Sequence, residues 1–123
     1  MTMHSKKMVR PPNSLLFISD MGGGEAPVPI RGVRLLSTSS CVSVGCYPEQ
    51  DGPTEVVLGD APEVDPGYAP AFDAALETPD RTVVVSTVER ESLLEAPVAD
   101  SRTRIRVWLN HARWPDKVIV GIG

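Results

Sequence analysis

The sequence has few of the residues from which recognisable active sites are built. Two histidines and two cysteines occur in 123 residues, and aromatic residues make up 5% of the chain. Cys41 and Cys46 lack the CxxC spacing of zinc and thiol-redox sites. In one extended strand their Cα atoms would lie roughly 16 Å apart, too far for a disulfide. We therefore expect two free thiols, which suits a reducing, cytoplasmic compartment.

Long apolar runs are also missing. No run approaches the roughly 20 residues that cross a bilayer, so no membrane partner is expected. Twelve prolines and ten glycines interrupt the chain, and they exclude long helices over most of it. A core poor in aromatic residues must be built from Val, Leu, Ile and Ala, whose branched members favour strands.

Between the prolines and glycines lie seven or eight short apolar runs, at residues 15–19, 33–36, 42–47, 55–58, 72–76, 82–88, 103–109 and 118–122. Short strands at this spacing are typical of a sandwich or barrel. The expected fold class is all-β: a small antiparallel β-sandwich of about seven or eight strands with at most one short helical turn. Residues 1–13 are expected to form a flexible N-terminal tail, and residues 14–123 a single sandwich domain.

The clearest strand is residues 102–110, where Thr103, Ile105, Val107 and Leu109 alternate with Arg102, Arg104, Arg106 and Trp108. Period 2 places the first set in the core and the second outside. Residues 118–122 are expected to complete a hairpin with this strand. A second hairpin is expected between residues 42–47 and 55–58, because Asp51-Gly52 is a favoured turn pair. Residues 60–70 should be a surface loop, and residues 89–96 are either strand or a single helical turn.

Three candidate sites lack the neighbouring residues that their chemistry requires. His111 lies in a turn, and no nucleophile motif accompanies it. The glycine-rich residues 20–25 are followed by Pro27 and Pro29 rather than by a phosphate-binding helix. A calcium site would draw on four acids whose spacing matches no calcium loop, namely Asp60, Glu63, Asp65 and Asp73. We expect no catalytic residue, no metal and no cofactor.

Charge is segregated along the chain, and this gives the candidate binding residues. Residues 48–100 hold thirteen acids and two bases, whereas residues 101–123 hold five bases and one acid. The acids Asp60, Glu63 and Asp65 are expected to attract a basic protein partner. On the penultimate strand, the row of Arg104, Arg106 and Trp108 is the second candidate surface, for an acidic protein. The net charge of −4 argues against a nucleic-acid partner.

The strand order resembles that of the bacterial competence nuclease-inhibitor family and of similar small immunity-type β-sandwiches. The segments that carry the resemblance are CVSV at 41–44, TEVVL at 54–58, RTVVV at 81–85, TRIRVW at 103–108 and KVIV at 117–120. The resemblance implies a non-enzymatic protein that covers the basic active site of a nuclease. It transfers no functional residue, because it consists of strand rhythm and a late strand with tryptophan.

The leading hypothesis is therefore a cytoplasmic, non-enzymatic protein-binding module, in its sharpest form an inhibitor or immunity protein of a nuclease or toxin. The alternative is a structural or assembly subunit of a phage particle or bacterial supramolecular complex. A small enzyme with an unrecognised site comes third. Self-association through the oppositely charged patches remains open.

Overall fold

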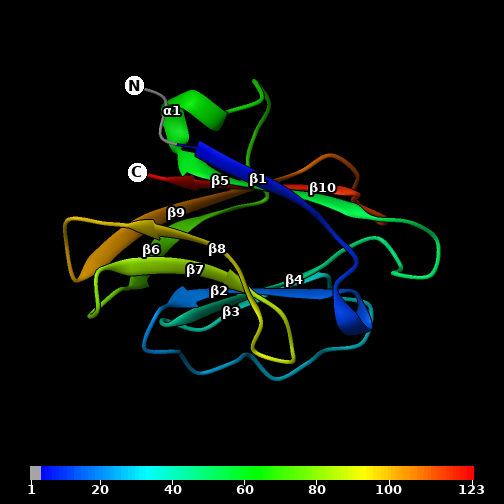
Figure 1. The fold of residues 1–123 in the computed structure, drawn as a ribbon, viewed down its shortest axis with the longest axis horizontal. Helices are drawn as coiled ribbons and strands as arrows, with labels where there is room; N and C mark the ends of the chain where they lie inside the picture. Colours follow the sequence, from blue (N-terminus) through cyan, green and yellow to red (C-terminus); the bar gives the residue numbers. More distant parts are fainter. Residues whose placement is uncertain (1–3) are drawn as a thin grey trace.

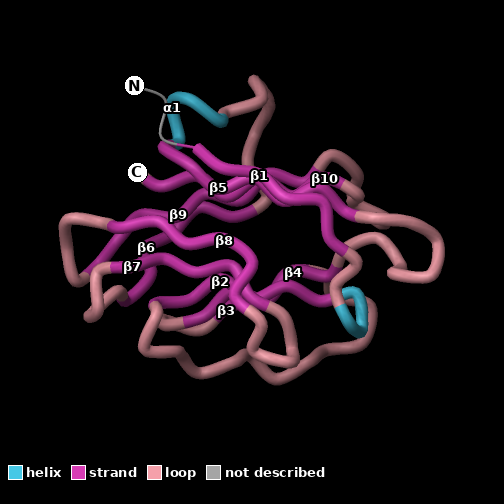
Figure 2. The backbone as a smooth tube through the Cα atoms, in the orientation of Figure 1, coloured by secondary structure: helices cyan, strands magenta, loops and turns pink. Residues whose placement is uncertain are grey.

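The computed structural model describes residues 4–123 as two five-stranded sheets packed face to face (Figure 1). Strand dominates the backbone, as the tube view shows (Figure 2). Sheet A has the order β1-β5-β10-β9-β6, and sheet B the order β3-β4-β2-β7-β8. The expected all-β class is thus confirmed, with ten strands rather than seven or eight. None of the helices in the described part is long and apolar enough to cross a membrane.

Sheet A consists of β1 (His4–Val9), β5 (Thr54–Asp60), β10 (Lys117–Ile122), β9 (Arg102–Leu109) and β6 (Phe72–Glu77). Sheet B consists of β3 (Leu35–Ser37), β4 (Cys41–Gly45), β2 (Leu15–Asp20), β7 (Thr82–Ser86) and β8 (Ser92–Pro97). A 3₁₀ turn (Pro12–Ser14) leads into β2, and one helical turn, α1 (Ala61–Val64), follows β5.

The core lies between the sheets and is built almost wholly from branched side chains. Alternate residues of each strand point inward, and those that become fully buried include Ile18, Val44, Leu58, Ile105, Val107 and Val120. The hairpin of β9 and β10 is confirmed by antiparallel pairing from Val118 with Leu109 to Ile122 with Ile105. All pairings are antiparallel except that of β10 with β5, so sheet A is mixed.

The flexible-tail prediction is wrong for residues 4–9. These residues form β1, an edge strand that pairs antiparallel with β5 from His4 opposite Gly59 to Val9 opposite Thr54. Backbone pairing rather than apolar burial holds β1, since its side chains are exposed up to Met8. A strand of this kind has no apolar period to reveal it. The first three residues of the predicted tail lie outside the described part.

One expected hairpin is also wrong, and the alternative left open for residues 89–96 is decided in favour of strand. Residues 42–47 and 55–58 do not form a hairpin, because β4 belongs to sheet B and β5 to sheet A; the Asp51-Gly52 segment crosses between the sheets instead. Residues 89–96 contribute strand β8, which pairs with β7. The single helical turn lies instead in the predicted loop 60–70, as α1.

Candidate functional site

The arginine row of β9 lies on the outer face of sheet A, as the alternation predicts. Ile105 and Val107 are fully buried, whereas Arg104 is exposed. The Arg104 guanidinium donates from Nε and Nη2 to the two carboxylate oxygens of Asp73, at 2.8 and 2.7 Å. This bond lowers the pKa of Asp73 and raises that of Arg104. Arg104 is therefore already paired within the chain.

Arg106 is also engaged. Its Nε and Nη2 donate to the backbone oxygen of Gly123 at 3.0 and 2.6 Å. Its guanidinium carbon lies 5.7 Å from the ring centre of Trp108, within cation–π range. The guanidinium groups of Arg104 and Arg106 are thus held in place and partly neutralised by groups of the same chain.

The prediction that Trp108 is displayed on the surface is wrong, although its face is correct. Trp108 is 1% exposed because α1 and the loop after it cover this part of sheet A, and it packs with Ala61, Val57 and Ile119. Its Nε1 donates to the backbone oxygen of Tyr68 at 2.8 Å. Trp108 therefore anchors the covering segment and is unavailable to a partner.

Gly121 makes this anchoring possible. A Cβ at this position would lie 2.7 Å from Cζ3 of Trp108 and 3.1 Å from Ala61. Only glycine leaves room for the indole and the first helical residue to lie this close to β10. In the sequence, Gly121 is only a residue without a side chain between Val120 and Ile122. The packing of Trp108 and Ala61 against it could therefore not be predicted from the sequence.

The anchored segment carries the acidic candidates, and the structure brings them together as one projection, which we call the acidic cap: residues 60–68. Asp60 ends β5, Glu63 lies in α1 and Asp65 follows it, all three exposed. Asp65 Oδ1 accepts the N–H of Gly67 at 2.8 Å, and the Tyr68 side chain is 45% exposed. Figure 1 shows α1 and its loop standing above sheet A. Tyr68 was missed from the sequence because it lies in an aperiodic loop.

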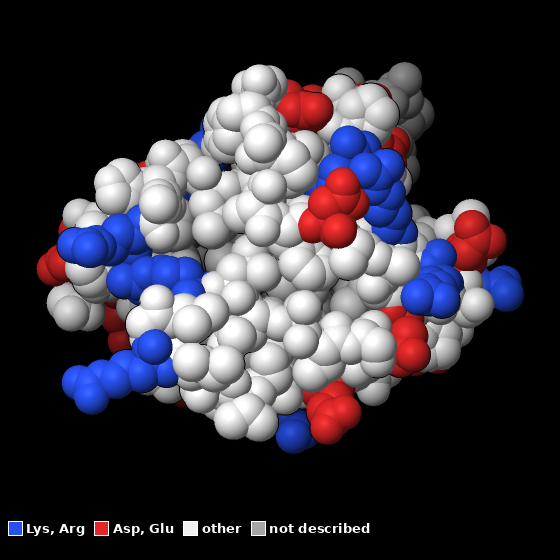
Figure 3. Space-filling view, turned by 180° about the vertical axis from the view of Figure 1, so that it is seen from behind, with Lys and Arg blue, Asp and Glu red and all other residues white. Residues whose placement is uncertain are grey.

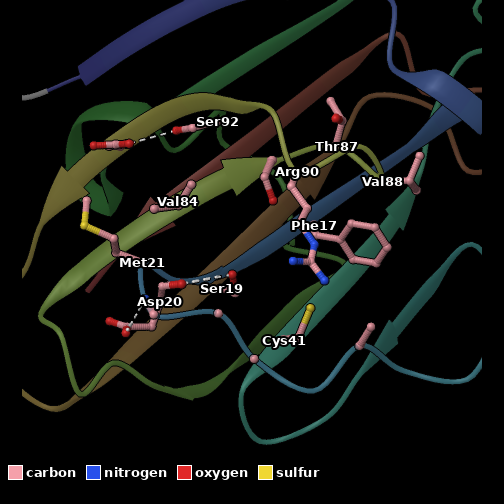
Figure 4. Close-up of a pocket in the computed structure, with 16 residues that line it drawn as sticks. Phe17, Ser19, Asp20, Met21, Cys41, Val84, Thr87, Val88, Arg90 and Ser92 are labelled. Carbon is pink, nitrogen blue, oxygen red and sulfur yellow. Dashed lines mark hydrogen bonds between the residues drawn. The ribbon is translucent and has the colours of Figure 1, made fainter.

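On sheet B, a pocket of about 700 Å³ opens on the outer face. Phe17, Ser19, Cys41 and Val84 line it, and Arg90 extends over it from the β7–β8 turn (Figure 4). Asp20, at its border, is buried, and its carboxylate accepts the N–H groups of Gly22 and Asp80, each at 3.1 Å. These contacts give Asp20 a structural role, as a brace between two loops.

The histidine considered for catalysis closes a turn. His111 Nδ1 accepts the backbone N–H groups of Arg113 and Trp114 at 3.1 and 2.9 Å. Its acceptor nitrogen is therefore occupied by the chain. Within residues 4–123, no three His, Cys, Asp or Glu side chains are grouped so as to hold a metal ion.

Both cysteines are free and buried. Burial raises the pKa of each thiol from its ordinary 9.0 to about 11. The thiolate is the reactive form. Neither side chain is thus prepared to act as a nucleophile near neutral pH, including Cys41, which borders the pocket.

This burial predicts slow labelling. At pH 8, iodoacetamide should react with both thiols about 100-fold more slowly in the folded protein than in urea, because two pKa units remove that much thiolate. Mass spectrometry of quenched time points measures each site separately. Equal rates in the folded and unfolded protein would contradict the burial of the thiols.

Comparison with known proteins yields a likeness in fold. No protein-family model matches the sequence, and no curated protein matches it. Among solved structures, the chain is similar to the crystal structure of ComJ, inhibitor of the DNA degrading activity of NucA, from Bacillus subtilis, with a TM-score of 0.67 and 7% identity. The match covers 99% of this chain and 97% of that one. The resemblance noted from strand order is thereby confirmed for the fold.

Proposed function

We propose that this protein is a non-enzymatic inhibitor that binds a nuclease or another toxin. The observation that carries the proposal is the likeness in fold to a nuclease inhibitor over nearly the whole of both chains. Because fold alone does not determine function, the proposal also rests on the surface. The described part offers a projecting acidic cap, while His111 closes a turn and both thiols are buried.

The acidic cap is the surface that we assign to the partner. A nuclease holds DNA phosphates with cationic side chains, so its active site attracts a dense group of carboxylates. Asp60, Glu63 and Asp65 lie within six consecutive residues that contain no base. Tyr68, beside them, supplies an aromatic ring of the kind enriched at interface hot spots. Arg104 and Arg106 lie on the same face of sheet A and would contact acidic groups at the rim of the partner.

The cap is held rigidly enough to serve this role. Its underside is fixed to sheet A by Ala61, which is fully buried against Trp108, and by the bond from Trp108 to the Tyr68 carbonyl. A preorganised surface loses less conformational entropy on binding. We also propose a cytoplasmic location, which the two free cysteines support.

Charge reversal of the acidic cap tests the proposal. The variant combines Asp60→Lys and Glu63→Lys with Asp65→Asn, which keeps an acceptor for the N–H of Gly67. Close charge pairs across such interfaces couple by about 1.5–7 kcal/mol, so the inhibition constant against a nuclease of the NucA kind should rise at least about 100-fold. Degradation of plasmid DNA at graded inhibitor concentrations measures it.

The matched control reverses three exposed acids elsewhere, with Glu89→Lys, Glu91→Lys and Asp100→Lys. It changes net charge by a similar amount and should leave inhibition within about threefold, because exposed charges away from the contact act mainly on the association rate. Equal losses in both variants would indicate a general charge effect and contradict the assignment to the cap. A wild-type protein that inhibits no DNA-degrading nuclease and no toxin would refute the function itself.

A further inference from the structure

The four strands at the edges of the two sheets differ in how they are protected. Edge strands expose unpaired backbone groups, and proteins usually block them with charge, proline or short length. In β1 the block is Lys6 and Lys7, and β8 carries Glu95 and Pro97. The third edge strand, β3, has three residues. The remaining one, β6, has six residues with two alanines at its centre and neither lysine nor proline; its charged residues are Asp73, which is paired with Arg104, and Glu77 at its end.

The direction in which the backbone groups of β6 point follows from a hydrogen bond at its end. The N–H of Glu77 donates to the Ser39 oxygen at 2.9 Å, on the side away from β9. In a strand, alternate residues direct their backbone groups to the same side. Asp73 and Ala75 therefore direct their N–H and C=O groups away from β9 as well, where no described strand pairs with β6.

A contact on β9 supports this direction. Gly123 donates its N–H to the Arg104 oxygen at 2.9 Å, so the backbone of Arg104 faces β10. Arg104 stands opposite Ala75 in the register. The two residues form a non-hydrogen-bonded pair, and the backbone groups of Ala75 must point outward.

From Phe72 to Ala75 the side chains along this edge leave it open to another strand, whereas the outward N–H of Glu77 is already bonded to Ser39. Ala74 and Ala75 are both exposed and small. Asp73 is the one charged residue from Phe72 to Leu76, and Arg104 neutralises it at 2.7 Å. Figure 3 views the molecule from behind: uncharged side chains fill most of the middle of this side, one acidic group lies against basic atoms above and to the right of it, and the other charged side chains lie towards the rim.

We propose that β6 pairs antiparallel with β6 of a second copy of this chain, centred on Ala74, and joins two copies of sheet A into one continuous sheet. In this register Asp73 lies opposite Ala75 of the second copy, and Phe72 opposite its Leu76. Each outward N–H and C=O of Asp73 and Ala75 then finds a partner. The interface is isologous, as a two-fold axis requires.

The sequence of β6 fits itself in this register better than it fits an arbitrary strand. At the axis, Ala74 meets its own copy in a non-hydrogen-bonded pair, where Cα atoms lie only about 4.5 Å apart and small side chains are favoured. Asp73 of the second copy adjoins Ala75, whose neighbour on the other side is Arg104. Each Asp73 carboxylate thus lies near the Arg104 guanidinium of the other copy, with only the Ala75 methyl group between them. On the inner face, half-buried Phe72 meets Leu76.

A cysteine at the axis tests the register. Ala74→Cys should form a disulfide between copies within minutes of adding a mild oxidant at micromolar protein, because the pair separation lies within the disulfide range. The matched control is Ala99→Cys, at an exposed alanine in the β8–β9 turn, which should stay monomeric on a non-reducing gel. Buried Cys41 and Cys46 do not interfere. Equal crosslinking of both variants overturns the proposal.

Light scattering after size exclusion tests the association itself. Wild type should show twice the 13.2 kDa of one chain. Ala74→Lys, which places two like charges at the axis, should show one chain mass, as should Ala75→Pro, which removes an outward donor. The control Ala99→Lys should remain dimeric. A monomeric wild type, a ring or filament, or a dimer that survives Ala74→Lys overturns the proposal.

This outcome is separable from the inhibitor function, because the acidic cap and the β6 edge share no residue. A protein that inhibits a nuclease as a monomer, and loses this inhibition in Ala74→Lys with an unchanged melting temperature, would assign the edge to a strand of the nuclease and overturn self-pairing.

Discussion

Replacing Trp108 by alanine should lower the free energy of unfolding by about 3–5 kcal/mol, the range for removing a large buried aromatic side chain. The indole is 1% exposed and fills the space between sheet A and α1. Its loss opens a cavity that Ala61 and Ile119 cannot close without moving the helical turn. The change also leaves the Tyr68 carbonyl without its donor. Urea denaturation followed by circular dichroism measures the effect.

Trp108→Phe separates packing from the hydrogen bond. Phenylalanine keeps most of the apolar contact but cannot donate to Tyr68, so it should cost less than alanine, on the order of 1–2 kcal/mol. Both variants should also weaken inhibition, because the acidic cap stands on this anchor. A loss below 1 kcal/mol for Trp108→Ala would mean that the indole is exposed, as strand periodicity alone had suggested.

The two-residue period correctly predicted which side of a strand each side chain points to. It did not predict which outward-pointing side chains are covered by other segments. The alternation along β9 correctly separated Ile105 and Val107 from Arg104. It could not show that α1, more than 40 positions earlier, returns to cover Trp108. The same limit applies to β1, whose exposed side chains carry no apolar pattern although its backbone is paired with β5.

Pairing between distant strands was the other part that the sequence did not determine. The turn pair Asp51-Gly52 suggested a hairpin, yet in a sandwich a short connection can equally cross from one sheet to the other. The parallel pairing of β5 with β10 has no local signal either. Once β6 pairs with β9, Asp73 reaches Arg104; before that register is known, Asp73 is one acid among thirteen in its segment.

For the candidate site, too, groups within one segment could be predicted, whereas contacts between strands could not. Asp60, Glu63 and Asp65 could be proposed together because they are close in the chain, and a single turn of helix keeps them close in space. The arginine row was predicted as a binding patch, but its partners Asp73 and Gly123 come from other strands. Local sequence therefore reports groups that a single segment brings together, whereas their neutralisation depends on the whole fold.

Core truncation on β9 should be far more damaging than charge removal on the same strand. Ile105→Ala should lower the free energy of unfolding by about 2–5 kcal/mol, because the side chain is fully buried between the sheets and the packed neighbours collapse only in part. Ile105 is 0% exposed and belongs to the main core cluster. Urea denaturation should show a lower midpoint with an unchanged slope.

Arg104→Ala is the control one position away, and its urea midpoint should stay close to that of the wild type. Its ion pair with Asp73 is exposed on both sides, at 54% and 38% of the side-chain areas, and solvent screens such pairs. The two positions share strand, neighbours and backbone geometry, so a difference between them isolates the side of the sheet to which each points. If Arg104→Ala were the more damaging, the inward and outward faces of β9 would have to be exchanged. The arginine row would then lie in the core, where every guanidinium would need a buried partner.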